Sequence, residues 1–245
     1  MKSYNIKERN MIKNKLSKVA VALLASTMLM SSASATTITL QYDDTSGFTG
    51  VTGEKALSGF QEAASFWESM FTDDVTVNLA IDFAVLGNGI LGSTGSSAIN
   101  WTYQGFSGYL VNDATSALDA VAVSNLSCDT TQAAGAAPCA INFLDRERDT
   151  DDNADWESRI DRDGSVDNYY LNVNTANAKA MGIDLVGAGV MAADDADANI
   201  TFSSAFDFDY DATDGIDGYD FVGIAIHEIG HALGFVSGVD TYDHL

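Results

Sequence analysis

The sequence is short of basic residues, prolines and cysteines. Among its 245 residues, 12 Lys and Arg stand against 35 Asp and Glu, which gives a formal net charge of −23. So acidic a chain repels nucleic acid and anionic membranes, and we therefore expect no nucleic-acid partner. The single proline excludes a Pro-rich linker, and the sequence has neither a Gly/Ser-rich linker nor an internal repeat. It offers no obvious place to divide the chain into separate domains.

Long apolar runs are also missing. The run from Val19 to Met30 has 12 residues, whereas a membrane-spanning helix needs about 20. Six Lys and Arg residues precede this run, and Ala33-Ser34-Ala35 follows it. A basic start, a short apolar core and an A-x-A site are typical of a secretory signal peptide, with an N-terminal membrane anchor as the alternative. We predict a cleaved signal peptide over residues 1–35 and a secreted or periplasmic domain over residues 36–245, without a stable membrane span.

The only two cysteines, Cys128 and Cys139, flank a segment of small residues that is typical of a loop. In an exported chain, two cysteines this close predict a disulfide that closes the loop. Paired zinc thiolates are the alternative, but the spacing matches no zinc knuckle.

Where the apolar periodicity is clear, it predicts both helices and strands. Apolar residues recur with helical spacing from Glu54 to Phe71, and they alternate with polar residues from Val75 to Phe83. Helices and strands mixed along the chain predict an α/β (α+β) domain with a mixed twisted sheet. Further predicted elements are a strand over Tyr169–Val173, a helix over Asn174–Met181, a strand starting at Ile200 and a helix over Phe221–Leu233.

Four stretches carry weaker patterns. The glycine-rich residues 86–95 predict a loop that leads to a strand near Tyr103, and residues 112–123 fit either a helix or a strand. Residues 145–168 and 207–220 are rich in aspartate. Aspartate favours turns and caps over helix interiors, so we predict exposed loops in both places.

The last predicted helix carries the most information. Asp220 is suited to cap its N-terminus, and Gly234 to end it. With helical spacing, His227 and His231 lie one turn apart on the face opposite an apolar one. The apolar face consists of Val222, Ala225, Ile226, Ile229 and Leu233.

His227 and His231 are two of only three histidines in the chain. Two imidazoles at positions i and i+4 of a helix can direct nitrogens at one Zn²⁺, at about 2.0–2.1 Å. Glu228 lies beside them, where it can take a proton from water that zinc has acidified, as in the HExxH arrangement. We predict His227 and His231 as metal ligands and Glu228 as the catalytic general base. Two ordinary surface histidines are the alternative.

The run HEIGHALGF at residues 227–235 resembles the active-site helix of the metzincin clan of zincin metallopeptidases, especially its leishmanolysin-like branch with HExxHALGF. Residues 220–240 also resemble a group of bacterial secreted metalloproteases. In metzincins a long helix and a strand precede the zinc helix, as the two predicted elements over residues 54–83 do here. The resemblance implies a zinc-dependent endopeptidase with a metzincin-like zincin domain, a hydrolase that acts on protein or peptide substrates.

The resemblance stops shortly after this helix. A metzincin would have a third histidine six residues after the second, and this chain has Ser237 there. The remaining candidates for a third zinc ligand are Asp240, His244 and a residue beyond the chain. The resemblance therefore implies that residues 36–245 form an N-terminal subdomain, incomplete at its C-terminus, or that the metal site is completed in an unusual way.

Alternate aspartates from Asp207 to Asp211 suggest a structural Ca²⁺ site. The EF-hand pattern is not met, because Ala212 stands where glycine is required and Gly218 where the bidentate glutamate belongs. A plain solvated loop is the alternative. The rival to the enzyme is a non-catalytic, calcium-dependent surface or matrix protein that retains a zincin fold. Glu228 favours the enzyme, since a binding module has no need of a general base.

Overall fold

A computed structural model describes residues 35–126, 139–148, 156–161, 166–211, 213, 215 and 217–236. The predicted signal peptide up to residue 34 lies outside the described residues. So do five residues named above: Cys128, Ala212, Ser237, Asp240 and His244.

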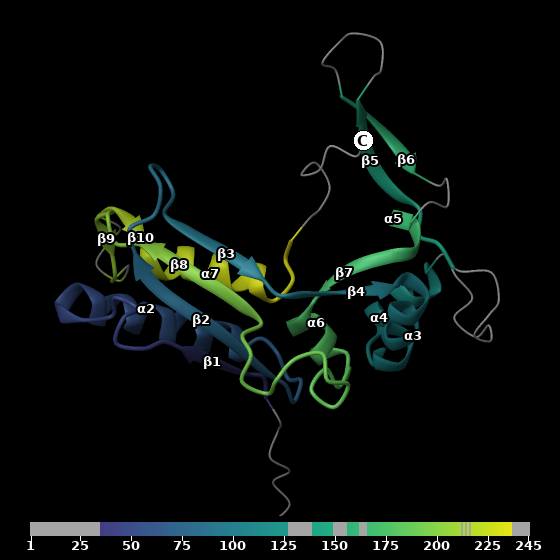
Figure 1. The fold of residues 1–245 in the computed structure, drawn as a ribbon, viewed down its shortest axis with the longest axis horizontal. Helices are drawn as coiled ribbons and strands as arrows, with labels where there is room; N and C mark the ends of the chain where they lie inside the picture. Colours follow the sequence, from purple (N-terminus) through teal and green to yellow (C-terminus); the bar gives the residue numbers. More distant parts are fainter. Residues whose placement is uncertain are drawn as a thin grey trace, which may run out of the picture. The chain divides into compact units, whose positions relative to one another are not determined.

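A four-stranded sheet organises the part of the molecule that carries the histidines. Its order is β1 (Thr37–Gln41), β2 (Thr76–Ala84), β8 (Ala198–Ser203) and β3 (Gly92–Ser96). The first three strands are parallel, and β3 pairs antiparallel with β8. Figure 1 shows the four strands with β3 last in the order, next to α7. The predicted mixed sheet is confirmed.

Two helices pack with this sheet around one apolar core. They are α2 (Gly50–Glu68) and α7 (Phe221–Ala232), which contact each other, while α7 also contacts β3 and β8. At the centre of the core, the Phe60 ring lies 4.9 Å from that of Phe202 and 5.4 Å from that of Phe221, and all three side chains are fully buried. Burial of three such rings is a large apolar contribution to folding. The core thus fixes α7 against both the sheet and α2.

A smaller cluster lies around β4 (Ala98–Thr102) and β7 (Tyr170–Asn174), which pair antiparallel. The helix α6 (Thr175–Ala180) follows β7 directly, as the sequence predicts. Asn174, just before α6, and Asn177, within it, donate side-chain hydrogen bonds to backbone carbonyls at the end of α7. The buried members of this cluster are Val173, Ala178, Ile183 and Leu185.

The remaining elements are short. They are α3 (Tyr103–Asp113), α4 (Ala117–Ser124), β5 (Phe143–Arg148), β6 (Trp156–Asp161), α5 (Val166–Tyr169), β9 (Phe208–Asp209) and β10 (Tyr219–Asp220). The stretch at 112–123, which fitted a helix or a strand, mostly belongs to α4.

Three predicted loops are wrong in part. Residues 207–220 contain the paired strands β9 and β10 and the buried side chain of Phe208. Residues 86–95 contain most of β3, whose run of glycine, serine and threonine carries no apolar alternation. This strand is held instead by pairing with β8 and by contacts with α7. Residues 145–168 contain most of β5, all of β6, which pairs antiparallel with β5, and most of the short helix α5. Abundant aspartate predicts turns from local preference alone, and cross-strand pairing overrides that preference here.

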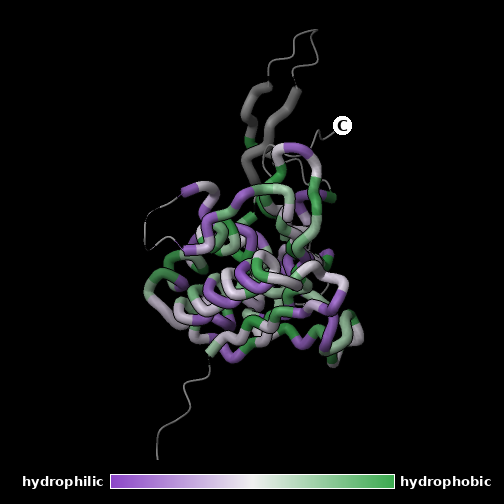
Figure 2. The backbone as a smooth tube through the Cα atoms, turned by 90° about the vertical axis from the view of Figure 1, so that its left-hand side faces the viewer, coloured by the Kyte–Doolittle hydropathy of each residue, from purple (hydrophilic) through white to green (hydrophobic). Residues whose placement is uncertain are grey.

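Green and purple segments alternate along the tube in Figure 2, which colours the residues by hydropathy. No helix among the described residues is long and apolar enough to cross a membrane.

Cys139 is disulfide-bonded in the structure.

Candidate metal centre

The start of α7 is fixed by its own first turn. Asp220 has extended backbone angles, and its Oδ1 accepts a hydrogen bond from the Gly223 N–H at 3.0 Å. This bond satisfies one of the helix-terminal N–H groups, which otherwise lack a partner. The predicted N-cap is confirmed.

The end of α7 has the geometry of a Schellman motif. The Phe235 N–H donates to the Gly230 carbonyl at 3.0 Å, and the Gly234 N–H donates to the His231 carbonyl at 3.1 Å. Gly234 has a φ of +100°, a conformation that favours glycine. A Cβ there would overlap the Asn177 side chain. Gly234 therefore ends the helix, as predicted, and turns the chain back over its last turn.

The imidazoles of His227 and His231 converge. Their Nε2 atoms lie 3.0 Å apart. The Nδ1 of His231 lies 2.7 Å from the carbonyl oxygen of Phe235. A carbonyl oxygen only accepts, so this contact places the proton of a neutral His231 on Nδ1 and leaves a lone pair on Nε2. Metal-binding histidines are commonly oriented by such a second hydrogen bond.

This pair fits zinc as two of its ligands. Two nitrogens bound at about 2.0–2.1 Å to a tetrahedral ion lie about 3.3 Å apart, so a small opening of the pair suffices. Among the described residues, no group of three or more His, Cys, Asp or Glu side chains is close enough to share an ion. Asp240 and His244, the predicted candidates for a third ligand, lie outside those residues.

Glu228 points to β3 and is 9% exposed. The Thr94 hydroxyl lies 2.6 Å from Glu228 Oε2 and 3.0 Å from the Glu228 carbonyl oxygen, so its single proton is best placed for the carboxylate. Gly92 leaves room for the side chain, because a Cβ there would lie 3.2 Å from Glu228 Cγ. Gly92 and Thr94 of β3 thus position the side chain of Glu228, the predicted general base.

The backbone of α7 near His231 is bonded from two further elements. The Ser96 hydroxyl and the Asn174 side-chain amide both donate to the His231 carbonyl at 3.2 Å, and the Asn177 amide donates to the Leu233 carbonyl at 3.1 Å. Sequence reasoning missed these residues and Thr94. They are small polar side chains far from the HExxH run, and no local pattern identifies them.

The Asp-rich loop before α7 is closed by its own hydrogen bonds. Asp209 accepts from the backbone N–H groups of Asp211 and Asp217, which lowers the pKa of its carboxyl group. The Thr213 hydroxyl and then its N–H lower the pKa of Asp211 in the same way. These carboxylates are therefore ionised and held in place by neutral donors. Calcium binding by this loop stays a prediction.

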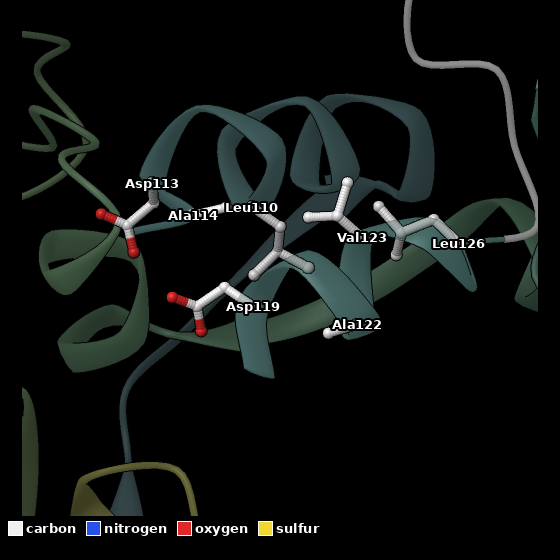
Figure 3. A pocket seen from close by; sticks show the side chains of 7 residues that line it. All are labelled: Leu110, Asp113, Ala114, Asp119, Ala122, Val123 and Leu126. Carbon is white, nitrogen blue, oxygen red and sulfur yellow. The ribbon is translucent and has the colours of Figure 1, made fainter. Parts of the chain in front are cut away.

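A separate cavity of about 80 Å³ lies between α3 and α4 (Figure 3). Its two carboxyl groups belong to Asp113 and Asp119. Ser116 is the N-cap of α4, and Asp119 completes the capping box as its third helical residue. The backbone N–H groups of Ser116 and Thr115 lower the pKa of Asp119. These contacts account for Asp119 as part of the helix cap. The other lining residues are Leu110, Ala114, Ala122, Val123 and Leu126.

Comparisons of the chain with protein-family models, with curated proteins and with solved structures give no match.

Proposed function

We propose that the protein is a secreted, zinc-dependent endopeptidase with a metzincin-like zincin domain. The observation that carries the proposal is the convergence of the His227 and His231 Nε2 atoms, 3.0 Å apart on one helix. The Nδ1 contact of His231 adds to it, since it leaves the lone pair of Nε2 directed at the same point. The alternative is a hydrogen bond between the two imidazoles alone, with His227 Nε2–H donating to the His231 Nε2 lone pair.

Zinc bound at this pair would polarise a scissile carbonyl and make water nucleophilic near neutral pH. The chain itself supplies the proton transfer. Glu228 accepts the proton of the attacking water and passes it to the leaving amine. Thr94 holds Oε2 of this carboxylate. Among the described residues, Oε1 accepts no hydrogen bond, which leaves it for the proton.

The order of elements also supports the metzincin resemblance. A long helix, α2, and a strand, β2, precede the helix that carries the two histidines, and all three share one core. Metal-assisted hydrolysis needs a rigid frame for its ligands, and packing of α7 between α2 and β3 provides one.

The test is the zinc content and activity of the purified protein. We expect about one zinc per chain, hydrolysis of a denatured protein substrate, and loss of that activity with a chelator. Glu228→Gln should keep the zinc and lower kcat by at least about 100-fold, the lower range for loss of a general base. Glu62→Gln, on the exposed face of α2, is the matched control. Wild-type kcat in Glu228→Gln would remove Glu228 from the mechanism.

A third ligand is the other part of the proposal. Catalytic zinc commonly has three protein ligands and water. Asp240 is a carboxylate six residues past Gly234, and His244 is the better donor type. Zinc affinity compared between Asp240→Ala and His244→Ala identifies the ligand as the residue whose loss releases the metal. If both variants keep the affinity of the wild type, the third ligand is neither of them.

A further inference from the structure

Phe235 connects the end of α7 to one of the two histidines. Its N–H closes the Schellman motif at Gly230, and its carbonyl oxygen lies 2.7 Å from His231 Nδ1. The position of this carbonyl sets both the tautomer of His231 and the direction of its ring. Phe235 nevertheless follows the helix and is 61% exposed. A contact from another element is therefore needed to fix the position of Phe235.

Trp67, on α2, provides that contact. Its ring stacks on the Phe235 ring, with centroids 5.4 Å apart and planes at 28°. Its indole N–H donates to the carbonyl of Ile226 at 2.9 Å. Ile226 directly precedes His227, so Trp67 touches the chain next to one histidine and touches the residue that orients the other.

Gly230 makes this approach possible. A Cβ at Gly230 would lie 3.2 Å from Trp67 Cζ2, closer than ordinary van der Waals contact. The missing side chain lets the indole lie against the helix on the turn that separates the two histidines. The small residue inside the HExxH run thus has a packing reason that involves α2.

We propose that Trp67 is a positioning residue for the zinc ligand His231, and that it acts through the Phe235 backbone carbonyl. The inference rests on the proposed zinc site. Loss of the Trp67 ring frees Phe235, and loss of the Phe235 ring has the same effect without touching α2. Both changes leave His227 and His231 themselves unaltered.

The experiment measures zinc affinity by competition with a chromophoric chelator. We expect Trp67→Leu and Phe235→Ala to bind zinc about tenfold more weakly, as when an outer partner of a ligating histidine is lost. Trp67→Phe and Phe235→Tyr keep the ring contact and should recover most of the affinity. Phe71→Leu is the matched control, because Phe71 also stacks on Trp67, whereas the carbonyl that contacts His231 belongs to Phe235.

A second measurement needs no metal. ¹⁵N-histidine NMR of the zinc-free protein should show His231 with its proton on Nδ1 in the wild type and a mixture of tautomers in Phe235→Ala. If Phe235→Ala keeps both the wild-type tautomer and the wild-type zinc affinity, the inference is wrong and the proposed function stands. If the wild type itself binds no zinc, the proposed function fails and the inference fails with it.

Discussion

The two ends of α7 are built in different ways. At its entry, Asp220 caps its own helix, and the loop before it is held by short-range bonds to Asp209 and Asp211. At its exit, the chain is held from α2, β3, β7 and α6, by residues 56 to 168 positions away in the sequence.

The two ends of α7 therefore contribute differently to stability and to metal binding. The entry uses exposed carboxylates and backbone N–H groups, so its stability depends on pH and on ionic conditions. The exit uses stacked rings, side-chain amides and a glycine turn, and it carries the histidine whose orientation matters. We therefore expect changes at the exit to affect both stability and metal binding, and changes at the entry to affect stability alone.

Gly234→Ala should give the largest effect. A side chain at a φ of +100° is strained and would also overlap Asn177. We expect the free energy of unfolding to fall by about 3 kcal/mol, measured by denaturant titration. Gly215→Ala is the control, since Gly215 has a φ of +110° with open space around it. If Gly215→Ala loses less free energy of unfolding than Gly234→Ala, the difference measures the overlap with Asn177. Equal losses in the two variants would mean that the exit of α7 is no more constrained than its entry.

Thr94→Val should lower kcat about tenfold with little change in zinc affinity, because a hydrogen bond to a charged group is lost. Thr94→Ser keeps the hydroxyl and should restore kcat. Ser96→Ala removes a neighbouring hydroxyl that bonds α7 but not Glu228, and it should leave kcat near that of the wild type. The role of Thr94 is purely structural if all three variants lose stability and none loses kcat.

Asp220→Ala removes the cap at the entry and should lower the free energy of unfolding by about 1 kcal/mol. Asp220→Asn keeps a capping oxygen and should lose much less. Zinc affinity should be unchanged in both, which distinguishes the entry from the exit. A fall in zinc affinity as large as that of Phe235→Ala would remove the distinction.

Asp211→Asn should cost a small part of the stability near neutral pH and should flatten the loss of stability in acid. The pKa of Asp211 is lowered from its ordinary value of 3.8 by the Thr213 hydroxyl and N–H. A lowered pKa stabilises the fold fully above the ordinary value, and this contribution is lost as the pH falls through the folded-state pKa. Below about pH 4, the wild type should therefore lose stability more steeply than Asp211→Asn or Thr213→Val. Identical acid profiles in all three would contradict this.

Calcium should give the smallest effect, if the loop binds it. Millimolar Ca²⁺ would then raise the melting temperature of the wild type, and Asp209→Asn combined with Asp211→Asn would remove the rise. If Ca²⁺ changes the melting temperature of neither protein, the loop binds no calcium and only its own hydrogen bonds hold it.

Sequence reasoning located the elements with strong periodicity. It predicted α2, β2 and α7 with both of its ends. It missed β3, because strand formation there depends on pairing with β8 and on Thr94 and Ser96 reaching α7. Trp67 falls within the apolar spacing of residues 54–71, which predicts a helix but not the contact of Trp67 with Phe235. Contacts between residues this far apart leave no spacing for a sequence pattern to detect.

The most direct test of the account is anomalous diffraction at the zinc edge, from crystals of the protein grown with zinc. We expect one peak at about 2.0–2.1 Å from both Nε2 atoms of His227 and His231. The Nδ1 of His231 should still contact the Phe235 carbonyl. Zinc bound elsewhere, with the two imidazoles joined only by a hydrogen bond to each other, would contradict the account.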